Sequence, residues 1–158
     1  MGVVSGDPVT LGEGSHERIV NMGNSYSIDD VEVTVEEYET CVEAEECDAA
    51  GTGIGCNSGV SGLEEHPINC VTWIEARGYC AWIGGRLPTE IDWEYAARYE
   101  DPEEHVYPWG TSYSIPETRL NALDAIDGYL LTAPVGSFPS GDSELELHDM
   151  AGNVWEWT

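Results

Sequence analysis

The sequence predicts a single α+β domain that is rich in loops and contains three short helices and several short strands. Two kinds of feature support this class. Threonine capping boxes mark the starts of short helices, and long stretches rich in Gly or punctuated by Pro separate them. No internal repeat is apparent, and short helices with scattered strands and irregular connections are typical of α+β domains.

The helices are predicted from their first turns. A capping box at Thr34, with glutamate three positions later, opens a helix that ends near Ala44. A second capping box at Thr72 opens a helix to about Ile83, which two glycines close. A third short helix begins at Thr89 and has acidic residues in its first turn, where the helix dipole favours them. We expect the first helix to turn three residues toward the core: Tyr38, Cys41 and Val42.

Loops and short strands are predicted for the rest of the chain. Alternating residues indicate a strand over 25–29, after an N-terminal region of loop and one short strand (1–27). Residues 66–71 form a strand-like run. The segment 48–64 shows no helical or strand periodicity and is expected to be a long loop. Long loops in compact domains are often functional or need a cross-link to hold them. Residues 99–145 are expected to hold turns and short strands.

The charge of the chain is strongly one-sided. Its 158 residues include 31 acidic side chains, five arginines and no lysine, which gives a formal net charge of −26. Because such a field repels nucleic acid and anionic lipid, we expect neither as a partner. The sequence shows no apolar run of about 18 residues that would span a membrane. It also shows no signal peptide.

Five cysteines allow two disulfides and one free thiol. Cys41 and Cys47 bracket the end of the first predicted helix, so we expect them to pair. Cys56 and Cys70 bracket a Gly-rich loop and form the second expected pair, although spacing alone leaves other arrangements open. Cys80 lies on a helix face with apolar neighbours and is interpreted as a buried structural thiol. Disulfides favour an exported protein, either extracellular or periplasmic.

The C-terminal run 147–158 combines a glycine-asparagine turn with two tryptophans that flank Glu156. Such a turn lets a carboxylate, an amide and backbone carbonyls converge on one point, and a ligand set made of oxygen atoms suits Ca²⁺. The alternative is a strand edge in which Trp155 and Trp157 face the core and Glu156 is simply solvated.

Several long motifs occur in a specific order along the chain. They are GRLPTEIDWEYAAR (85–98), YPWG (107–110), TAPVG (132–136) and DMAGN (149–153), the last followed by VWEW. On these motifs, the chain from about Ile28 to Thr158 resembles the formylglycine-generating enzyme family, also called the sulfatase-modifying factor family. The resemblance implies the C-type-lectin-like variant fold of that family. It also implies one domain over residues 1–158, incomplete at its C-terminus and possibly at its N-terminus.

The resemblance further implies two structural Ca²⁺ sites. A hard cation takes six to eight oxygen ligands, which side chains and carbonyls of these loops can supply. For either site, the alternative is an Asx turn or a solvated acid. The first site would use the side chains of Asn121 and Asp127 with the carbonyls of Ala122 and Tyr129. The second would use the side chains of Asp149 and Glu156 with the carbonyls of Gly152 and Val154.

Enzymes of this family oxidise a cysteine of a sulfatase peptide to formylglycine, with O₂ and a Cu(I) ion held by a cysteine pair. Soft thiolates select Cu(I), and the family places that pair after the VWEW motif, so we expect the polypeptide as given to be inactive. One hypothesis is therefore part of an oxidase that acts on a sulfatase-type peptide, with Cu(I) only in the completed domain. The alternative is a non-catalytic, calcium-stabilised binding or accessory module with an unknown protein or ligand partner. The additional cysteines look like those of a secreted bacterial subgroup.

Overall fold

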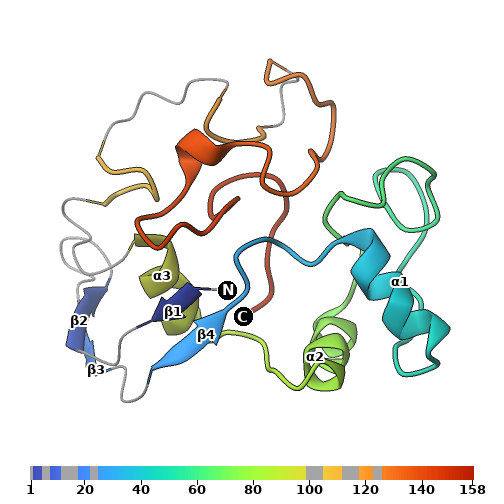
Figure 1. Cartoon of the computed structure of the whole chain (residues 1–158), viewed down its shortest axis with the longest axis horizontal. Coiled ribbons are helices and arrows are strands. Elements are labelled where there is room, and N and C mark those ends of the chain that lie inside the picture. Colours follow the sequence, from blue (N-terminus) through green and yellow to red (C-terminus); the bar gives the residue numbers. More distant parts are fainter. Residues whose placement is uncertain are drawn as a thin grey trace.

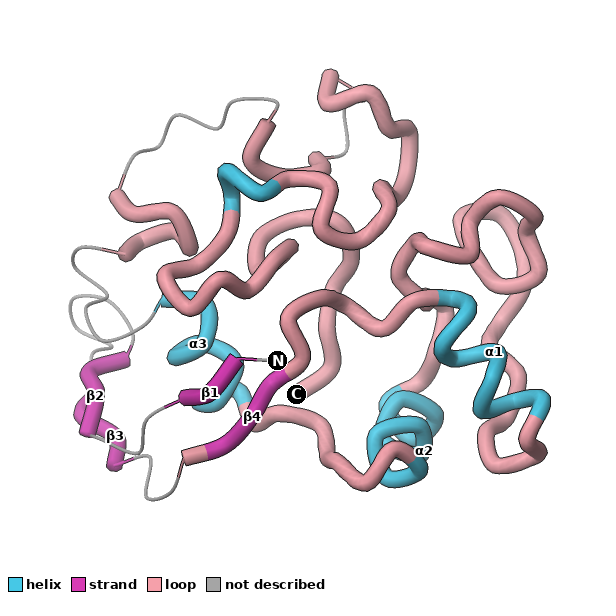
Figure 2. Tube along the Cα trace, in the orientation of Figure 1, coloured by secondary structure: helices cyan, strands magenta, loops and turns pink. Residues whose placement is uncertain are grey.

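The computed structural model of the chain describes residues 2–4, 8–11, 18–21, 25–98, 105–111, 118–122 and 126–158. These ranges contain three α-helices and four short strands, and loops make up most of the remaining trace in Figure 2. The mixed, loop-rich composition agrees with the predicted α+β class. No helix within the described ranges has the length and apolar character needed to cross a membrane.

The strands form two antiparallel pairs near the N-terminus. β1 (Gly2–Val4) pairs with β4 (Tyr26–Ile28), and β2 (Pro8–Leu11) pairs with β3 (Arg18–Asn21). In Figure 1, β1 and β4 lie to the lower left of the centre of the view, with the N and C marks drawn to their right. β4 confirms the strand predicted over 25–29. In register, Gly2 lies opposite Ile28, Val3 opposite Ser27 and Val4 opposite Tyr26, while Pro8 lies opposite Asn21 and Leu11 opposite Arg18.

α1 (Val35–Glu43) and α2 (Trp73–Trp82) begin at the predicted capping boxes. The hydroxyl oxygen of Thr34 accepts from the backbone N–H of Glu37 at 3.2 Å, and the Glu37 carboxylate accepts from the N–H of Thr34 at 2.9 Å. The same reciprocal pair opens α2. After α2 the chain turns at Gly84, whose φ of 84° is a left-handed value that glycine adopts without strain. Both helices therefore start on local signals, and α2 also stops on one.

α3 (Glu90–Arg98) begins at the third predicted position. The Thr89 hydroxyl oxygen accepts from the N–H of Asp92 at 3.2 Å, and the Asp92 carboxylate accepts from the N–H of Thr89 at 2.9 Å. Arg86 joins this cap, with its Nη1 2.9 Å from Oδ2 of Asp92. The start of α3 is thus fixed by a charged pair as well as by a capping box. The helix buries Asp92, Tyr95, Ala96 and Ala97.

Two hydrophobic clusters form the core of the described residues. The first joins α1 to α2 through the stacked rings of Tyr38 and Tyr79, whose centroids are 5.6 Å apart. As predicted, Tyr38 and Cys41 of α1 are buried, and Val42 is partly buried against them. The second cluster anchors the C-terminal loop to α3 and consists of Ala96, Ala97, Leu147 and Met150.

Both predicted disulfides are present. Cys41 and Cys47 lie with their Cα atoms 5.3 Å apart, and Cys56 and Cys70 lie 5.6 Å apart. The first closes the end of α1, and the second closes the long loop that was predicted over 48–64. Disulfides reduce the number of conformations open to the unfolded chain, so they stabilise this irregular segment although no sheet supports it.

A buried polar network also holds the long loop. Asn57 is 1% exposed, and its Nδ2 donates to the carbonyl of Pro67 at 2.8 Å and to Oγ1 of Thr132 at 3.0 Å. The same hydroxyl lies 2.9 Å from Nδ1 of His66, and the N–H of Asn57 donates to Oδ1 of Asn69 at 2.8 Å. The network therefore joins the loop to a segment that is 75 positions further along the chain.

Three predictions of strands differ from the structure. The N-terminal region, where one short strand was expected, holds β1, β2 and β3 in its described residues. Residues 66–71 form no strand, and only an isolated bridge between Thr34 and Pro67 remains. A proline cannot donate to a ladder, which limits this pairing. The described part of 99–145 contains turns, an isolated bridge and the 3-10 helix η2 (Pro139–Gly141), without a strand. Loops held by side-chain contacts replace the expected strands.

Candidate functional site

The C-terminal loop contains a turn of left-handed backbone. Asp149, Gly152 and Asn153 have φ values of 54°, 94° and 55°. A Cβ atom at Gly152 would stand 2.5 Å from the carbonyl oxygen of Asn121, so glycine is required for space as well as for conformation. Left-handed residues other than glycine persist only where neighbouring contacts fix them, and they gather at functional sites.

Asn153 links this turn to three other parts of the chain. Its Oδ1 accepts from the backbone N–H of Ala133 at 2.9 Å and from Nδ2 of Asn121 at 3.1 Å. Its Nδ2 donates to Oε2 of Glu32 at 2.6 Å. The next residue, Val154, donates its N–H to Oε1 of Glu32 at 3.2 Å. Side-chain hydrogen bonds therefore hold the turn in place.

Three carboxylates meet at the turn, and all three have raised pKa values. Loss of hydration, together with the charges of Asp149 and Glu156, raises the pKa of Glu32 to about 8. Burial raises the pKa of Asp149, although its carboxylate accepts from the N–H of Gly136 at 2.6 Å. Loss of hydration and the charge of Asp149 raise the pKa of Glu156 to about 7, although a hydrogen bond from Trp93 acts in the opposite direction. A bound cation would relieve this repulsion.

A cavity of about 450 Å³ opens beside the turn, between Asn121, Asp149, Glu156 and Trp93. Oδ1 of Asn121 is buried and has no hydrogen-bond partner. Nδ2 of Asn121 is used elsewhere, because it donates to the carbonyl of Leu131 at 2.8 Å. An orphaned buried polar atom costs free energy and indicates a missing ligand or water. Among the described residues no group of three His, Cys, Asp or Glu could hold a metal alone, so a cation here also needs amide or carbonyl oxygens.

The structure brings one member of the first predicted ligand set, Asn121, to the cavity that the second set lines. Asn121 of the first set is 4% exposed and lies in the cavity wall, where its carbonyl accepts from the turn. Asp127 instead accepts from the N–H groups of Ala122 at 2.8 Å and Tyr129 at 2.9 Å, which closes its own loop. Residues 123–125 of that loop lie outside the described residues. All members of the second set line the cavity: Asp149, Gly152, Val154 and Glu156.

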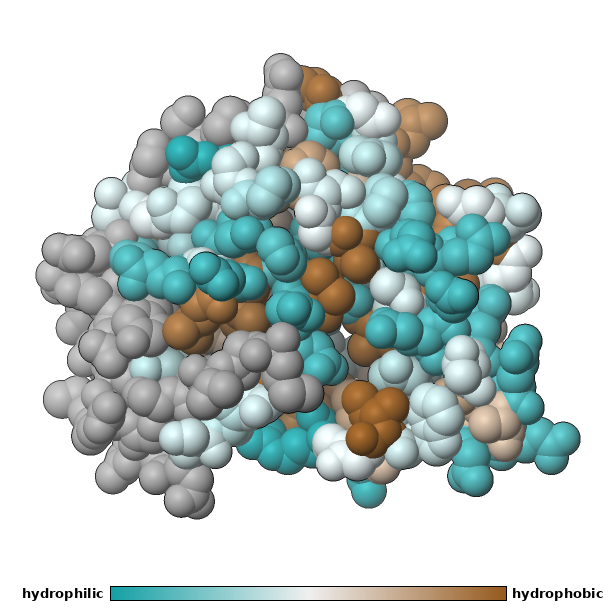
Figure 3. All heavy atoms as spheres, in the orientation of Figure 1, coloured by the Kyte–Doolittle hydropathy of each residue, from teal (hydrophilic) through white to brown (hydrophobic). Residues whose placement is uncertain are grey.

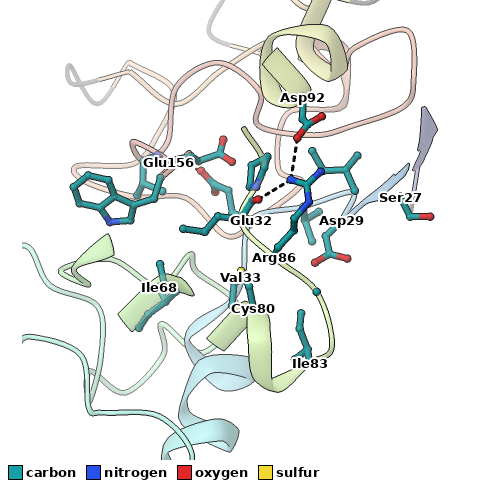
Figure 4. Close-up of a pocket in the computed structure, with 18 of the residues that line it drawn as sticks. Ser27, Asp29, Glu32, Val33, Ile68, Cys80, Ile83, Arg86, Asp92 and Glu156 are labelled. Carbon is teal, nitrogen blue, oxygen red and sulfur yellow. Dashed lines mark hydrogen bonds and ion pairs between the residues drawn. The ribbon is translucent and has the colours of Figure 1, made fainter. Parts of the chain in front are cut away.

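A second cavity, of about 470 Å³, shares the 154–156 wall with the first. Its walls come from the segment after β4, from α2 and from the C-terminal loop. In Figure 4, the carboxylates of Glu32 and Glu156 lie next to each other in this pocket, and Arg86 reaches Asp92 on another side. The apolar part of the lining includes Val33, Ile68, Val71, Ile83 and Met150. A mainly apolar pocket of this size with a few polar groups is typical of ligand sites.

Cys80 lines the second cavity and is the free cysteine of the chain. The thiol is half-buried. Loss of hydration and the nearby charge of Asp29 raise its pKa. A raised pKa keeps the thiol protonated, so it is a weak nucleophile and a weak metal ligand. The raised pKa agrees with the interpretation of Cys80 as a structural thiol, but the thiol is only half-buried rather than buried as predicted.

Exposed apolar side chains continue from this pocket over α2. In Figure 3, a hydrophobic patch lies over the position of α2 within a largely hydrophilic face. Trp155 is fully exposed, and Trp157 and Trp73 are partly exposed, so the strand-edge alternative with core-facing tryptophans is wrong. Nε1 of Trp73 donates to the carbonyl of Thr158 at 3.1 Å, and Nε1 of Trp157 donates to the carbonyl of Val71 at 3.0 Å. These hydrogen bonds hold the last residues of the chain against the start of α2.

Two residues of this region were not singled out from the sequence as site residues: Glu32 and Trp93. Glu32 lies between two valines in a segment that is half-buried, which is an unusual place for a carboxylate. That pattern is a usable signal. The partners of Glu32 have no signal in the sequence, because they are more than 120 positions away.

Comparison with known proteins places these features in a family. The family model described as the sulfatase-modifying factor enzyme 1-like domain matches residues 1–158. The chain is 43% identical over 110 residues to the inactive C-alpha-formylglycine-generating enzyme 2 of Bos taurus, covering 66% of this chain and 36% of that protein. It is 42% identical over 96 residues to the hercynine oxygenase of Mycolicibacterium thermoresistibile, covering 60% and 21%. It is 41% identical over 113 residues to the formylglycine-generating enzyme of Streptomyces coelicolor, covering 65% and 35%.

The chain thus spans roughly a third or less of the length of these relatives. Among solved structures, PvdO from Pseudomonas aeruginosa has the same fold, with a TM-score of 0.78 at 24% identity over 98% of this chain and 68% of that one. The family model, which matches the whole chain, agrees with the motifs and with this fold. The chain therefore belongs to the sulfatase-modifying factor enzyme 1-like family, the formylglycine-generating enzyme family that its motifs predicted.

Proposed function

We propose that this chain forms a calcium-stabilised, pocket-bearing part of a formylglycine-generating-enzyme-like domain. The observation that carries the proposal is the buried, unpartnered Oδ1 of Asn121 in a cavity that two carboxylates also line. The raised pKa values of Asp149 and Glu156 support it, because a cation would stabilise both charges. Ca²⁺ prefers carboxylate, amide and carbonyl oxygens, which are the groups present.

The bound calcium would be structural: it would neutralise the carboxylates and hold the left-handed turn. One cation would be held by the side chains of Asp149 and Glu156 with the carbonyls of Gly152 and Val154. A second would be held by the side chains of Asn121 and Asp127 with the carbonyls of Ala122 and Tyr129. Asn121 joins the two sets, because its carbonyl accepts from the N–H of Asn153 at 3.1 Å.

Cu(I) does not fit the residues of this chain. The family mechanism needs two thiolates, whereas four of the five cysteines are in disulfides. The remaining thiol, Cys80, has a pKa raised by burial and so resists forming a thiolate. We therefore propose that these 158 residues do not oxidise a cysteine by themselves and that their pocket serves binding.

A second candidate is part of a copper-dependent oxidase that acts on a sulfatase-type peptide. Identity to the formylglycine-generating enzyme of Streptomyces coelicolor favours it. Comparable identity to an inactive relative and to a hercynine oxygenase means that similarity alone does not choose between these activities. In this candidate the second cavity would bind substrate and the Cu(I) ligands would come from other residues of a completed domain.

We also propose that the fold is the C-type-lectin-like variant and that the protein is exported, outside the cell or in the periplasm. The mixed, loop-rich architecture and the likeness to PvdO support the fold. The two disulfides support export, because they persist in oxidising compartments.

Two measurements on the oxidised, folded chain test the proposal. Isothermal titration calorimetry should show Ca²⁺ binding, and Asp149→Asn should weaken it, whereas Asp48→Asn, an exposed acid in another loop, should not. A cysteine-containing sulfatase peptide, incubated with the chain, O₂ and Cu(I), should keep its mass. Absence of calcium binding would contradict the calcium proposal, and formation of formylglycine would favour the oxidase.

A further inference from the structure

Glu32 lies outside both predicted ligand sets but makes the longest-range polar contacts of the turn. Its two carboxylate oxygens accept from two different donors: Nδ2 of Asn153 at 2.6 Å and the N–H of Val154 at 3.2 Å. These residues are 121 and 122 positions further along the chain. Glu32 therefore joins the segment after β4 to the C-terminal turn.

The two donors belong to the part of the turn that would present carbonyl ligands. Val154 uses its N–H for Glu32, while its carbonyl is one of the oxygens proposed for the cation. Asn153 follows Gly152, whose carbonyl is another, and its φ of 55° is held by bonds to Glu32 and Ala133. The N–H of Val154 belongs to the peptide plane between Asn153 and Val154, which lies between the two planes that carry the carbonyls of Gly152 and Val154. Holding this plane and the Asn153 side chain restricts the backbone torsions that orient both carbonyls.

We propose that Glu32 is the positioning residue of the calcium site, which orients the carbonyls of Gly152 and Val154 without touching the cation. This inference rests on the proposed calcium binding. The observation behind it is the pair of hydrogen bonds from one carboxylate to the two residues that follow Gly152. Partners of this kind orient the groups that ligate a metal, and their loss typically weakens metal binding about 10- to 100-fold.

The role requires a carboxylate of this length. Both contacts need an acceptor, and a glutamine offers one oxygen and one NH₂ donor, so Glu32→Gln would set a donor against a donor. An aspartate keeps the charge but is one methylene shorter, so it cannot span both contacts. An effect of charge and an effect of positioning can therefore be separated. Glu32→Asp keeps the carboxylate charge but removes the positioning contacts.

The experiment compares four proteins: wild type, Glu32→Gln, Glu32→Asp and Glu36→Gln. Glu36 is exposed in the first turn of α1, so Glu36→Gln makes the same substitution away from the turn. Calcium affinity is measured by calorimetry, and Tb³⁺ luminescence excited through tryptophan reports on the same cavity, because Trp93 lines it. Thermal unfolding in a chelator records stability without the cation.

We expect Glu32→Gln and Glu32→Asp to bind Ca²⁺ about 10- to 100-fold more weakly than wild type, with weaker Tb³⁺ luminescence at equal concentration, and Glu36→Gln to bind within about twofold. A merely structural role would lower stability in the chelator but leave the affinity of the folded protein unchanged. If Glu32→Gln fails to fold, Glu32→Asp decides. Equal affinity in wild type and folded Glu32 variants would overturn the inference alone. No binding by wild type would overturn the proposed calcium site itself.

Discussion

The disulfide region (residues 34–72) and the C-terminal turn (residues 149–156) satisfy their buried polar groups in different ways. In the disulfide region, the buried amide of Asn57 gives both its donor contacts to protein oxygens, and two disulfides close the loops. Near the C-terminal turn, the buried Oδ1 of Asn121 has no partner, and Glu32 and Glu156 have pKa values raised to about 8 and about 7.

The difference shows which region stands on its own. A loop with covalent links and paired polar groups gains its stability from the chain itself. A turn with three neighbouring carboxylates and left-handed backbone loses free energy through repulsion and strain. We infer that the C-terminal turn reaches full stability with a cation.

Removing the disulfide between Cys56 and Cys70 should cause the largest loss in the free energy of unfolding. This disulfide closes a segment with a sequence separation of 14, and loop-closure entropy predicts that its removal lowers the free energy of unfolding by about 3 kcal/mol. The shorter link between Cys41 and Cys47, with a separation of 6, should cost about 2 kcal/mol. Urea unfolding of the two double Cys→Ser variants measures both. A larger loss for the shorter link would contradict this account of the disulfide region.

Calcium should stabilise the protein through the C-terminal turn. At a free concentration 100-fold above its Kd, Ca²⁺ should raise the free energy of unfolding by about 2.7 kcal/mol. The variant without the Cys56–Cys70 disulfide should gain the same amount, because the two regions contribute independently. Urea unfolding with and without a chelator gives both values. If calcium no longer raised the free energy of unfolding once the Cys56–Cys70 disulfide was removed, the cation would act through the disulfide region and not through the C-terminal turn.

A glycine in each region provides a matched pair. Gly152 and Gly59 both have left-handed φ values, 94° and 73°, but only the Cβ of an alanine at Gly152 would meet the carbonyl of Asn121. We expect Gly152→Ala to lose about 2 kcal/mol more than Gly59→Ala, since overpacking adds about 1–3 kcal/mol to the conformational cost. Thermal unfolding of both variants compares them. Equal losses would mean that the turn can move away from Asn121.

Asp92 is a carboxylate whose pKa is shifted in the opposite direction from those of the C-terminal turn. Burial alone would raise its pKa, but hydrogen bonds from Thr89 and the Arg86 guanidinium outweigh burial and hold the pKa below its ordinary 3.8. A lowered folded pKa contributes stability above the ordinary value, and this contribution is lost as the pH falls through the folded value. Asp92→Asn should therefore cost about 1 kcal/mol at neutral pH, as loss of a helix cap does.

The difference between wild type and Asp92→Asn should shrink as the pH falls below about 3.8, where the wild-type carboxylate becomes protonated. Urea unfolding across acid pH measures the difference. A gap that stays constant to the lowest pH would mean that the charge of Asp92 does not matter for α3.

Features that depend on neighbours in sequence were predictable. Thr34 and Thr72 start helices because their cap partners lie three positions away, and the disulfides follow from cysteines that flank one helix end and one loop. The fold beyond these elements could not be read locally. Residues 66–71 have strand-like composition, but Pro67 lacks a donor and only one bridge forms.

The candidate site was predictable only in part. The motif around Gly152 and Asn153 marked the turn, and the resemblance supplied the proposed ligands, which stay a prediction. Glu32 was missed because its donors lie more than 120 positions away, and contacts at that separation depend on how loops pack. The long-range contacts of Asn121 were missed for the same reason.

The most direct test of the proposed calcium site is a crystal structure grown with Ca²⁺. We predict a cation in the cavity beside Asp149 and Glu156, with ligand oxygens at about 2.3–2.6 Å. Glu32 should keep its bonds to Asn153 and Val154. A well-ordered turn without a cation at high calcium concentration, with Oδ1 of Asn121 bonded to water, would contradict the account.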